Sequence, residues 1–226
     1  MEVEVNVQEI FVCINEVLGV EVVKSRRSED LFSKAVEEIR KLYRIENLKD
    51  DPTMKAFRNF YWKIGIDPTK QRPSSEALLR RVLRGKIPLI NNVVDAGNIA
   101  SIETLIPIGV YDLDKIRGNL RIRFAKRGEK FYPIDGQEEI LMENQIVLAD
   151  DEKVLHIYPY RDSKLTMVTE STKNVLIVAC GVPGVEVEKV LEACKKASQY
   201  IVSLAGGKAG TCKIILPPHS FQQRSI

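Results

Sequence analysis

The spacing of apolar residues changes part-way along the chain, and this change limits the possible folds more than any other feature. Over residues 31–43, and again after Asp51-Pro52 and Ser74, apolar residues recur every three or four positions, which is typical of amphipathic helices. Over residues 120–124 apolar and basic residues alternate strictly, as in a strand with one buried face. Helices followed by strands predict an α+β domain in which a mostly antiparallel sheet is flanked by helices.

Local signals place the expected elements more closely. Ser28, Asp51 and Ser74 stand where helix caps are expected, and residues 187–204 carry the pattern of a long final helix. The remaining apolar runs predict strands at residues 145–149, 154–158, 164–169, 174–180 and 211–216, and either a strand with a bulge or a tight hairpin at residues 10–23. No repeat or linker divides the chain, so we expect one domain over residues 1–226, with an N-terminal addition over about 1–50, a core over about 55–205 and a polar tail over 217–226.

The composition is that of an ordinary globular protein. The 226 residues are 44% hydrophobic and 29% charged, and the net charge is only +3, so nucleic-acid binding must depend on where the charges lie. No segment approaches the roughly 18 apolar residues that a membrane span needs. The four cysteines, Cys13, Cys180, Cys194 and Cys212, are far apart in sequence. The first three lie in apolar surroundings, as expected of reduced thiols in the cytoplasm.

Several common mechanisms lack their residues. The chain has only two histidines, His156 and His219, and His156 stands in an alternating strand where a hydrogen-bonded core or edge histidine is the simpler interpretation. No cysteine or histidine spacing fits a zinc site. The glycine-rich run at residues 206–210 lacks the serine or threonine that a phosphate loop needs for magnesium. We therefore expect no metal, no nucleotide and no other cofactor.

A polar stripe is expected on one predicted helix. If residues 92–104 are helical, Asn92, Asp95, Asn98 and Ser101 follow one another at steps of three, and Asn91 lies four positions before Asp95. Asparagine and aspartate are poor residues for a helix interior, because their side chains compete for backbone hydrogen bonds. Such conflicts with local preference are frequent at functional sites. A binding site and a capped, solvated helix face both remain possible.

Basic residues gather in two places. Between residues 115 and 130 the only acid is Glu129, and seven residues are basic: Lys115, Arg117, Arg121, Arg123, Lys126, Arg127 and Lys130. A second cluster, at the end of a predicted helix, contains Arg80, Arg81, Arg84 and Lys86. Such patches are typical of contact with phosphate groups, while a solvated basic surface is the alternative.

A group of ordered motifs resembles a known family. The motifs are Asn92-Val93-Val94-Asp95, Asn98, the run from Pro107 to Ile116, Gly128-Glu129 and Ile146-Val147-Leu148-Ala149-Asp150. Together they resemble the B3/B4 domain of the phenylalanyl-tRNA synthetase β chain, over roughly residues 55 to 205. The segment from Gln71 to Arg81 looks like that of freestanding members of the family. The resemblance implies a layered α+β fold.

The resemblance also implies a function. In the synthetase this domain hydrolyses the ester of a wrongly attached amino acid, so this chain would bind the 3′ end of an aminoacyl-tRNA and deacylate it in trans. Glu129 and Asp95 would be the catalytic carboxylates. The substrate-binding positions would be Asn91, Asn92, Asp95, Asn98, Ser101, Gly109, Arg72 and Arg80. The RNA phosphates would contact Arg81, Arg84, Arg117, Arg121, Arg123, Lys126 and Arg127.

Two departures from the family pattern leave other functions open. Gly109 stands where the synthetase usually carries a histidine, and Val178-Ala179-Cys180 stands where it often reads Glu-Ala-Ala. These changes indicate either a wider pocket for a different amino acid or a pocket that binds without hydrolysis. The alternatives are a non-catalytic RNA-binding module and a protein that binds a free amino acid or another small molecule. No membrane partner is expected, and the sequence does not predict the oligomeric state.

Overall fold

The computed structural model describes residues 2–218, so His219 and most of the expected polar tail lie outside the described part. The helices are α1 Arg26–Leu42, α2 Pro52–Lys63, α3 Ser74–Leu83, α4 Asn92–Thr104 and α5 Val187–Ala205, with three-residue 3₁₀ turns η1 Leu48–Asp50, η2 Leu113–Lys115 and η3 Lys164–Thr166. The strands are β1 Val3–Val5, β2 Phe11–Leu18, β3 Ile108–Asp112, β4 Leu120–Phe124, β5 Lys130–Phe131, β6 Glu139–Ile140, β7 Ile146–Ala149, β8 Val154–Ile157, β9 Arg161–Asp162, β10 Asn174–Gly181, β11 Lys208–Ala209 and β12 Lys213–Ile215. None of the described helices is long and apolar enough to cross a bilayer.

The strands form two main sheets instead of the single sheet that the sequence predicts. The first has the order β1-β4-β7-β8-β9, and the second has the order β11-β2-β10-β3, with β12 also paired to β2. A short ribbon joins β5 to β6. Strand pairing is antiparallel throughout the described chain except between β1 and β4. The predicted α+β class with mostly antiparallel pairing is therefore confirmed.

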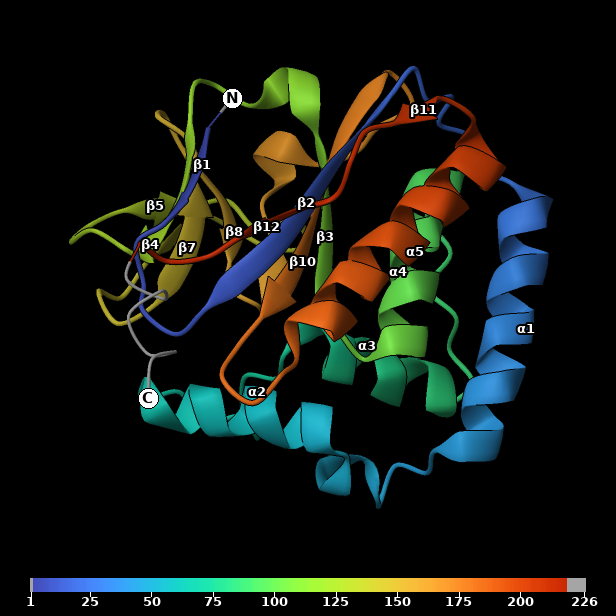
Figure 1. Ribbon diagram of the computed structural model, residues 1–226, viewed down its shortest axis with the longest axis horizontal. Helices are drawn as coiled ribbons and strands as arrows, with labels where there is room; N and C mark the ends of the chain where they lie inside the picture. Colours follow the sequence, from blue (N-terminus) through green and yellow to red (C-terminus); the bar gives the residue numbers. More distant parts are fainter. Residues whose placement is uncertain (1, 219–226) are drawn as a thin grey trace, which may run out of the picture.

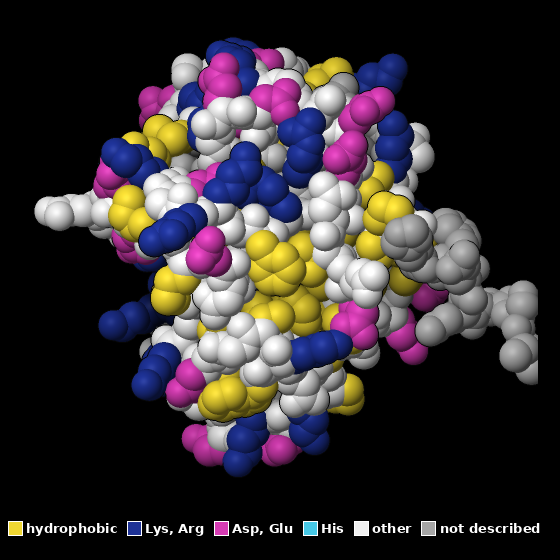
Figure 2. Space-filling model, turned by 90° about the vertical axis from the view of Figure 1, so that its left-hand side faces the viewer, with side chains coloured by type: hydrophobic (Ala, Val, Ile, Leu, Met, Phe, Trp, Pro, Cys, Tyr) yellow, Lys and Arg dark blue, Asp and Glu magenta, His cyan; other side chains and the backbone are white. Residues whose placement is uncertain are grey.

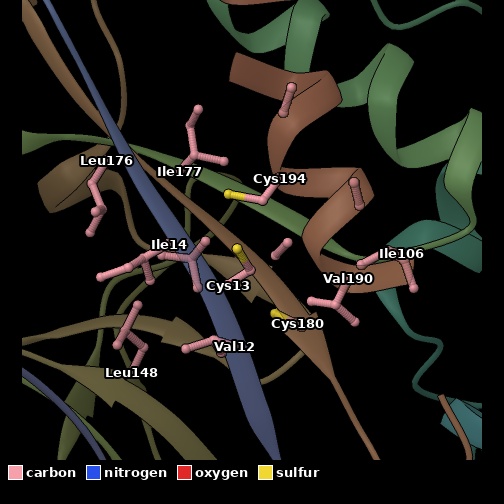
Figure 3. Packing of buried hydrophobic residues seen from close by; sticks show 14 of the residues in the cluster. Val12, Cys13, Ile14, Ile106, Leu148, Leu176, Ile177, Cys180, Val190 and Cys194 are labelled. Carbon is pink, nitrogen blue, oxygen red and sulfur yellow. The ribbon is translucent and has the colours of Figure 1, made fainter. Parts of the chain in front are cut away.

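The elements stack in layers (Figure 1). Helices α4 and α5 lie side by side against one face of the β2–β10–β3 sheet, α1 packs outside them, and the β4–β7–β8 sheet lies on the other side. Alternate residues of one strand point to opposite faces of a sheet. Accordingly, Ile14 and Leu176 point toward Leu148 of the first sheet, while Cys13 points toward α5 (Figure 3). The space between the two sheets is thus a second interior region, separate from the one beneath the helices.

The helix starts test the expected caps. Asp51 caps α2 as predicted, because its carboxylate accepts hydrogen bonds from the backbone N–H groups of Thr53 (2.8 Å) and Met54 (3.2 Å). The expected caps at Ser28 and Ser74 are wrong. Helix α3 begins at Ser74 itself, after Pro73, and the side chain of this serine makes no capping bond. Helix α1 begins at Arg26, and the buried Ser28 hydroxyl lies 2.8 Å from Oδ2 of Asp95 on α4. The hydrogen bond to Asp95 on another helix therefore explains why Ser28 lies inside α1 and does not cap it.

The strand expectations hold except at residues 164–169 and in the expected strand at residues 10–23, where β2 ends at Leu18. The hairpin of β7 and β8, the alternating strand β4 and the long strand β10 are confirmed. Residues 164–166 instead form the 3₁₀ turn η3, whose start is fixed by the Ser163 hydroxyl, which accepts a bond from the Leu165 N–H at 3.2 Å. Local side-chain capping explains why an apolar spacing here does not produce a strand.

Candidate functional site

The polar stripe of α4 lies inside the protein. Asn91 is the N-cap, and its side chain accepts bonds from the N–H groups of Val93 (3.2 Å) and Val94 (2.9 Å). Asn92 is buried and makes three backbone hydrogen bonds: it accepts from the Val23 N–H at 2.9 Å and donates to the carbonyls of Glu21 at 2.9 Å and Leu204 at 3.1 Å. Asn91 thus caps α4 itself, and Asn92 joins α4 to the chain before α1 and to the end of α5.

The next positions of the stripe are also engaged. Asp95 accepts from the Ile90 N–H at 2.9 Å and from the Ser28 hydroxyl at 2.8 Å, and burial raises the pKa of its carboxyl group. The Ser101 hydroxyl donates to the Ile106 carbonyl at 2.7 Å. Asn98 is partly exposed and makes no side-chain hydrogen bond with any described residue. The binding and catalytic roles expected of this stripe stay predictions, and Asn98 has the free amide.

Arginines of the first basic cluster are paired with acids. Arg123 holds Glu129 with two bonds of 2.9 and 2.7 Å, and Arg121 lies 2.5 Å from Asp151. Burial opposes ionisation of Glu129, but the bonds from Arg123 and from the Lys126 N–H outweigh it and lower the pKa of this carboxyl group. On this side of the molecule basic and acidic side chains are intermixed (Figure 2). The predicted catalytic role of Glu129 stays a prediction.

The other predicted phosphate-binding residues of this cluster differ in whether their charged groups are hydrogen-bonded. Arg117 donates to the carbonyl of Asp114 at 2.8 Å, which fixes it against its own turn. Lys126 and Arg127 are exposed at the turn after β4, and neither forms an ion pair with a described acid. Within the described chain, Arg117, Lys126 and Arg127 therefore form no ion pair with a carboxylate, and the phosphate contacts expected on this surface stay predictions.

The second basic cluster encloses a pocket. We name it the basic pocket; its volume is about 400 Å³, and its lining is Lys70, Arg72, Ala77, Arg80, Arg81, Arg84, Lys86 and Tyr160. No acid contributes to this lining. Within the described chain, Lys70, Arg81, Arg84 and Lys86 have no carboxylate partner. The structure thus brings together Arg72, Arg80, Arg81 and Arg84, which were predicted to contact substrate or phosphate.

A buried acid outside the lining holds arginines of this pocket in place. Glu76 of α3 is fully buried, and it accepts bonds from Arg58 at 3.0 Å and from Arg80 at 2.8 Å. Arg72 lies 3.9 Å from the same carboxylate. Because one carboxylate holds several guanidinium groups, the arginines are oriented before any ligand arrives, and the site retains a positive charge.

Buried polar atoms without hydrogen-bond partners lie in two segments, residues 61–75 and 156–166. Within the described part, these atoms belong to Tyr61, Gln71, Arg72, Ser75, His156, Arg161 and Thr166. The segments are joined by the bond from the Ser74 N–H to the Pro159 carbonyl at 2.9 Å. Buried polar atoms without hydrogen-bond partners are rare in native proteins, and a bound ligand or water is a common explanation for them. Their concentration beside the basic pocket marks this junction as the candidate site.

A polar triad lies between the two sheets, next to this junction. Asp162 of β9 accepts a bond from the Tyr111 hydroxyl at 2.8 Å and lies 2.8 Å from Nδ1 of His156. Burial, together with the negative charge of Asp162, raises the pKa of Tyr111 well above its ordinary value. His156 is buried and its Nε2 atom has no partner, whereas the Asp162 side chain is 32% exposed. Asp162 therefore connects the triad to the surface.

Gly109 lies beneath one member of this triad. A Cβ atom at Gly109 would overlap the hydroxyl oxygen of Tyr111 and come within 2.5 Å of its Cζ atom. The phenol thus fills the space into which a side chain at position 109 would project. At this position the missing side chain therefore adds no open space, because the Tyr111 hydroxyl occupies it.

The sequence analysis missed five residues of the candidate site. Lys70 and Tyr160 line the pocket, and His156 and Asp162 form the triad with Tyr111. The signal was the run Tyr158-Pro159-Tyr160-Arg161-Asp162, which places polar and aromatic residues directly after a buried strand. Its relation to the segment around Gln71 depends on tertiary structure and is not visible in sequence spacing.

The chain is similar in sequence to known proteins. The family model described as "B3/4 domain" matches residues 56–206. The phenylalanine–tRNA ligase beta subunit of Fusobacterium nucleatum is 30% identical over 165 residues, which cover 63% of this chain and 21% of the relative. That of Aquifex aeolicus is 31% identical over 128 residues, which cover 57% and 16%. The chain spans about a fifth of the length of these curated relatives.

A solved structure is also similar. It is an N-terminal fragment of the phenylalanyl-tRNA synthetase beta-subunit from Pyrococcus horikoshii, with a TM-score of 0.48 and 20% sequence identity. The alignment covers 92% of this chain and 50% of the fragment.

Proposed function

The chain belongs to the B3/4 domain family, and from this premise we propose that it binds the 3′ end of an aminoacyl-tRNA with the basic pocket on the phosphates. The observation that carries the proposal is the set of four cations around that pocket without a carboxylate partner in the described chain: Lys70, Arg81, Arg84 and Lys86. The related proteins named above are ligases that act on phenylalanine and tRNA.

The size and chemistry of the pocket suit a nucleotide end. Its volume of about 400 Å³ is within the range of ordinary ligand pockets. The guanidinium group of arginine can donate two parallel hydrogen bonds to the oxygens of a phosphate. Tyr160 lines the pocket and offers an aromatic face on which a base can stack. Arg81 and Arg84 lie on the outer part of the lining, so they are available to the first incoming phosphates.

We propose further that the bound aminoacyl ester is hydrolysed in trans. An aminoacyl ester is already reactive, so a site needs mainly to hold it, orient a water molecule and stabilise the oxyanion that develops. Asp162 lies two residues from Tyr160 and is the partly exposed carboxylate of the triad, which makes it the group we assign to orienting the water. Asp95 and Glu129 remain the carboxylates named by the sequence motifs. The cytoplasm is the compartment that this function implies.

A non-catalytic RNA-binding module is the second candidate. It is supported by the bonds that both predicted catalytic carboxylates already make. Asp95 accepts hydrogen bonds from Ser28 and Ile90, and Glu129 forms an ion pair with Arg123. The Tyr111 phenol above Gly109 favours the same conclusion, because it fills the place of the synthetase histidine.

A panel of mischarged tRNAs tests both candidates. The full chain is incubated with each mischarged tRNA and with the correctly charged tRNAs as controls, and ester loss is followed against buffer alone. We expect faster loss for at least one mischarged pair, with the acceleration absent in Asp162→Asn and binding weakened in Arg81→Ala with Arg84→Ala.

The other possible outcomes distinguish the two candidates from each other and from a small-molecule binder. Binding to tRNA without faster ester loss from any pair contradicts hydrolysis and supports the second candidate. A rise in melting temperature with a free amino acid and no binding to tRNA contradicts both and favours a small-molecule binder.

A further inference from the structure

Three cysteines that are distant in sequence meet at one point of the fold. Cys13 lies in β2, Cys194 in α5, and Cys212 directly before β12. Their sulfur atoms all lie within 4.8 Å of one another. Sequence spacing gave no sign of this group, because the antiparallel pairing of β12 with β2 and the packing of α5 on the same sheet create it.

The group is enclosed on one side and accessible on the other. Cys13 and Cys194 are fully buried and point toward each other between β2 and α5 (Figure 3). Cys212 is partly exposed and lines a pocket of about 710 Å³ that also borders Lys195, Lys208 and Gly210. An ion that enters this pocket therefore meets the sulfur of Cys212 first.

We infer that Cys13, Cys194 and Cys212 form a binding site for a soft metal ion, Zn²⁺ in the first instance, with the pocket supplying its open fourth position. Thiolate sulfur is the ligand that zinc and other soft ions prefer. Three sulfurs bound to tetrahedral zinc at about 2.3 Å lie about 3.8 Å apart, so the present group needs to contract by about 1 Å or less. Three protein ligands with one open position are typical of accessible zinc sites.

The surroundings hold the ligands and offset their charge. The buried amide of Asn15 donates to the Ser198 hydroxyl at 2.8 Å, and this hydroxyl donates to the Cys194 carbonyl at 2.8 Å, which ties β2 to the ligand-bearing turn of α5. Such supporting hydrogen bonds fix the orientation of metal ligands. Lys195 and Lys208 at the pocket reduce the negative charge that three thiolates and one divalent ion leave.

Titration of the full chain tests the site. The reduced, chelator-treated protein is titrated with Zn²⁺ and, as a spectroscopic probe, with Co²⁺, whose thiolate complexes absorb in the near ultraviolet. We expect one ion per chain, the cobalt–thiolate band, and a higher melting temperature with zinc. In Cys212→Ser the affinity for zinc should fall by a factor on the order of 100 or more, because removal of a ligand exceeds the 10- to 100-fold effect of removing a supporting residue.

Cys180→Ala provides the control, because Cys180 is as buried as Cys13 and Cys194 but points to the opposite face of the same sheet. It should retain the metal stoichiometry and the cobalt band of the wild type. The inference is overturned if the reduced wild type binds no stoichiometric metal, or if Cys212→Ser binds it as tightly as the wild type. Because Cys212 is partly exposed, its variant tests the site even where substitution of Cys13 prevents folding.

Discussion

At the scale of single residues, Gly109 illustrates how one side chain determines another. Glycine is required at this position because the Tyr111 phenol passes over its Cα atom on the way to Asp162. The two residues lie on the same face of β3, separated by Val110, which points toward Gly97 of α4. The glycine and the tyrosine are therefore coupled, and the departure from the histidine of the synthetase motif is matched by a phenol that takes its space.

This coupling predicts the effect of Gly109→Ala. The added Cβ atom displaces the phenol and breaks its bond to Asp162, so we expect the free energy of unfolding to fall by about 2 kcal/mol, as for other overpacked cores. In a Tyr111→Ala background the same change should cost much less, because the ring is gone. Urea unfolding of the four proteins measures both costs, and equal costs would show that the overlap does not occur.

At the scale of elements, α4 is positioned by polar groups at its first turns. Asn92 binds three backbone groups on either side of the helix, and Asp95 bonds to Ser28 of α1 and to Ile90. Residues that are unfavourable for a helix interior are here used to attach the helix to its neighbours. Asn92 and Asp95 therefore break local preference for a structural reason, whereas Asn98 makes no such bond with a described residue.

The raised pKa of Asp95 predicts a particular dependence on pH. Burial makes the folded state hold this proton more tightly than the unfolded state, so the free energy of unfolding decreases as pH rises from the ordinary aspartate pKa through the folded one. Asp95→Asn stays neutral, and its amide group can still accept from Ile90 and donate to Ser28. We expect the variant to gain stability relative to wild type as pH rises through this window, measured by urea unfolding across the acidic range up to about pH 7.

Asp150→Asn is the matched control with the opposite sign. Burial opposes ionisation of Asp150, but bonds from Lys153 and from backbone N–H groups outweigh it and lower the pKa of its carboxyl group. This group contributes stability above its unfolded pKa and loses it as pH falls through the folded value, so its variant should lose stability relative to wild type as pH rises. The same trend in both variants would contradict the assignment for Asp95.

The elements themselves were largely predictable, because most are set by local rules. The cap at Asp51, the period of α5 and the alternation in β4 depend on neighbours in sequence. The errors at Ser28 and at residues 164–166 have tertiary or capping causes that apolar spacing does not contain. The division into two sheets was not predictable for a similar reason, since strand pairing depends on interactions between distant residues.

At the scale of the whole molecule, the two basic surfaces predicted from sequence differ in how far acidic residues neutralise them. The arginines around β4 are mostly neutralised by Glu129, Asp151 and Glu4, whereas the cations of the basic pocket gather around a cavity with no acid in its lining. Sequence alone could not distinguish them, because the acids Asp151 and Glu4 lie in other strands or turns. Only the fold shows which positive charge is free to attract phosphate.

The candidate site was predictable only in part for the same reason. Arg72, Arg80, Arg81 and Arg84 share one helix and the segments next to it, so their proximity follows from the sequence. Tyr160 and the triad of Tyr111, His156 and Asp162 join them through β3, β8 and β9, which come from separate parts of the chain. The same holds for the three cysteines around α5.

The most direct test of the proposed RNA-binding role is the salt dependence of binding to a tRNA acceptor stem that carries its 3′ single strand. Wild type is compared with Arg81→Ala plus Arg84→Ala in the basic pocket, and with Lys126→Ala plus Arg127→Ala on the β4 surface as the charge-matched control. We expect weaker binding by the pocket variant and a slope of log affinity against log salt that is smaller by about 1.4, because each single-strand phosphate that is no longer neutralised reduces the slope by about 0.7. Unchanged affinity and slope in the pocket variant, or a decrease of both in the control instead, would contradict this role for the basic pocket.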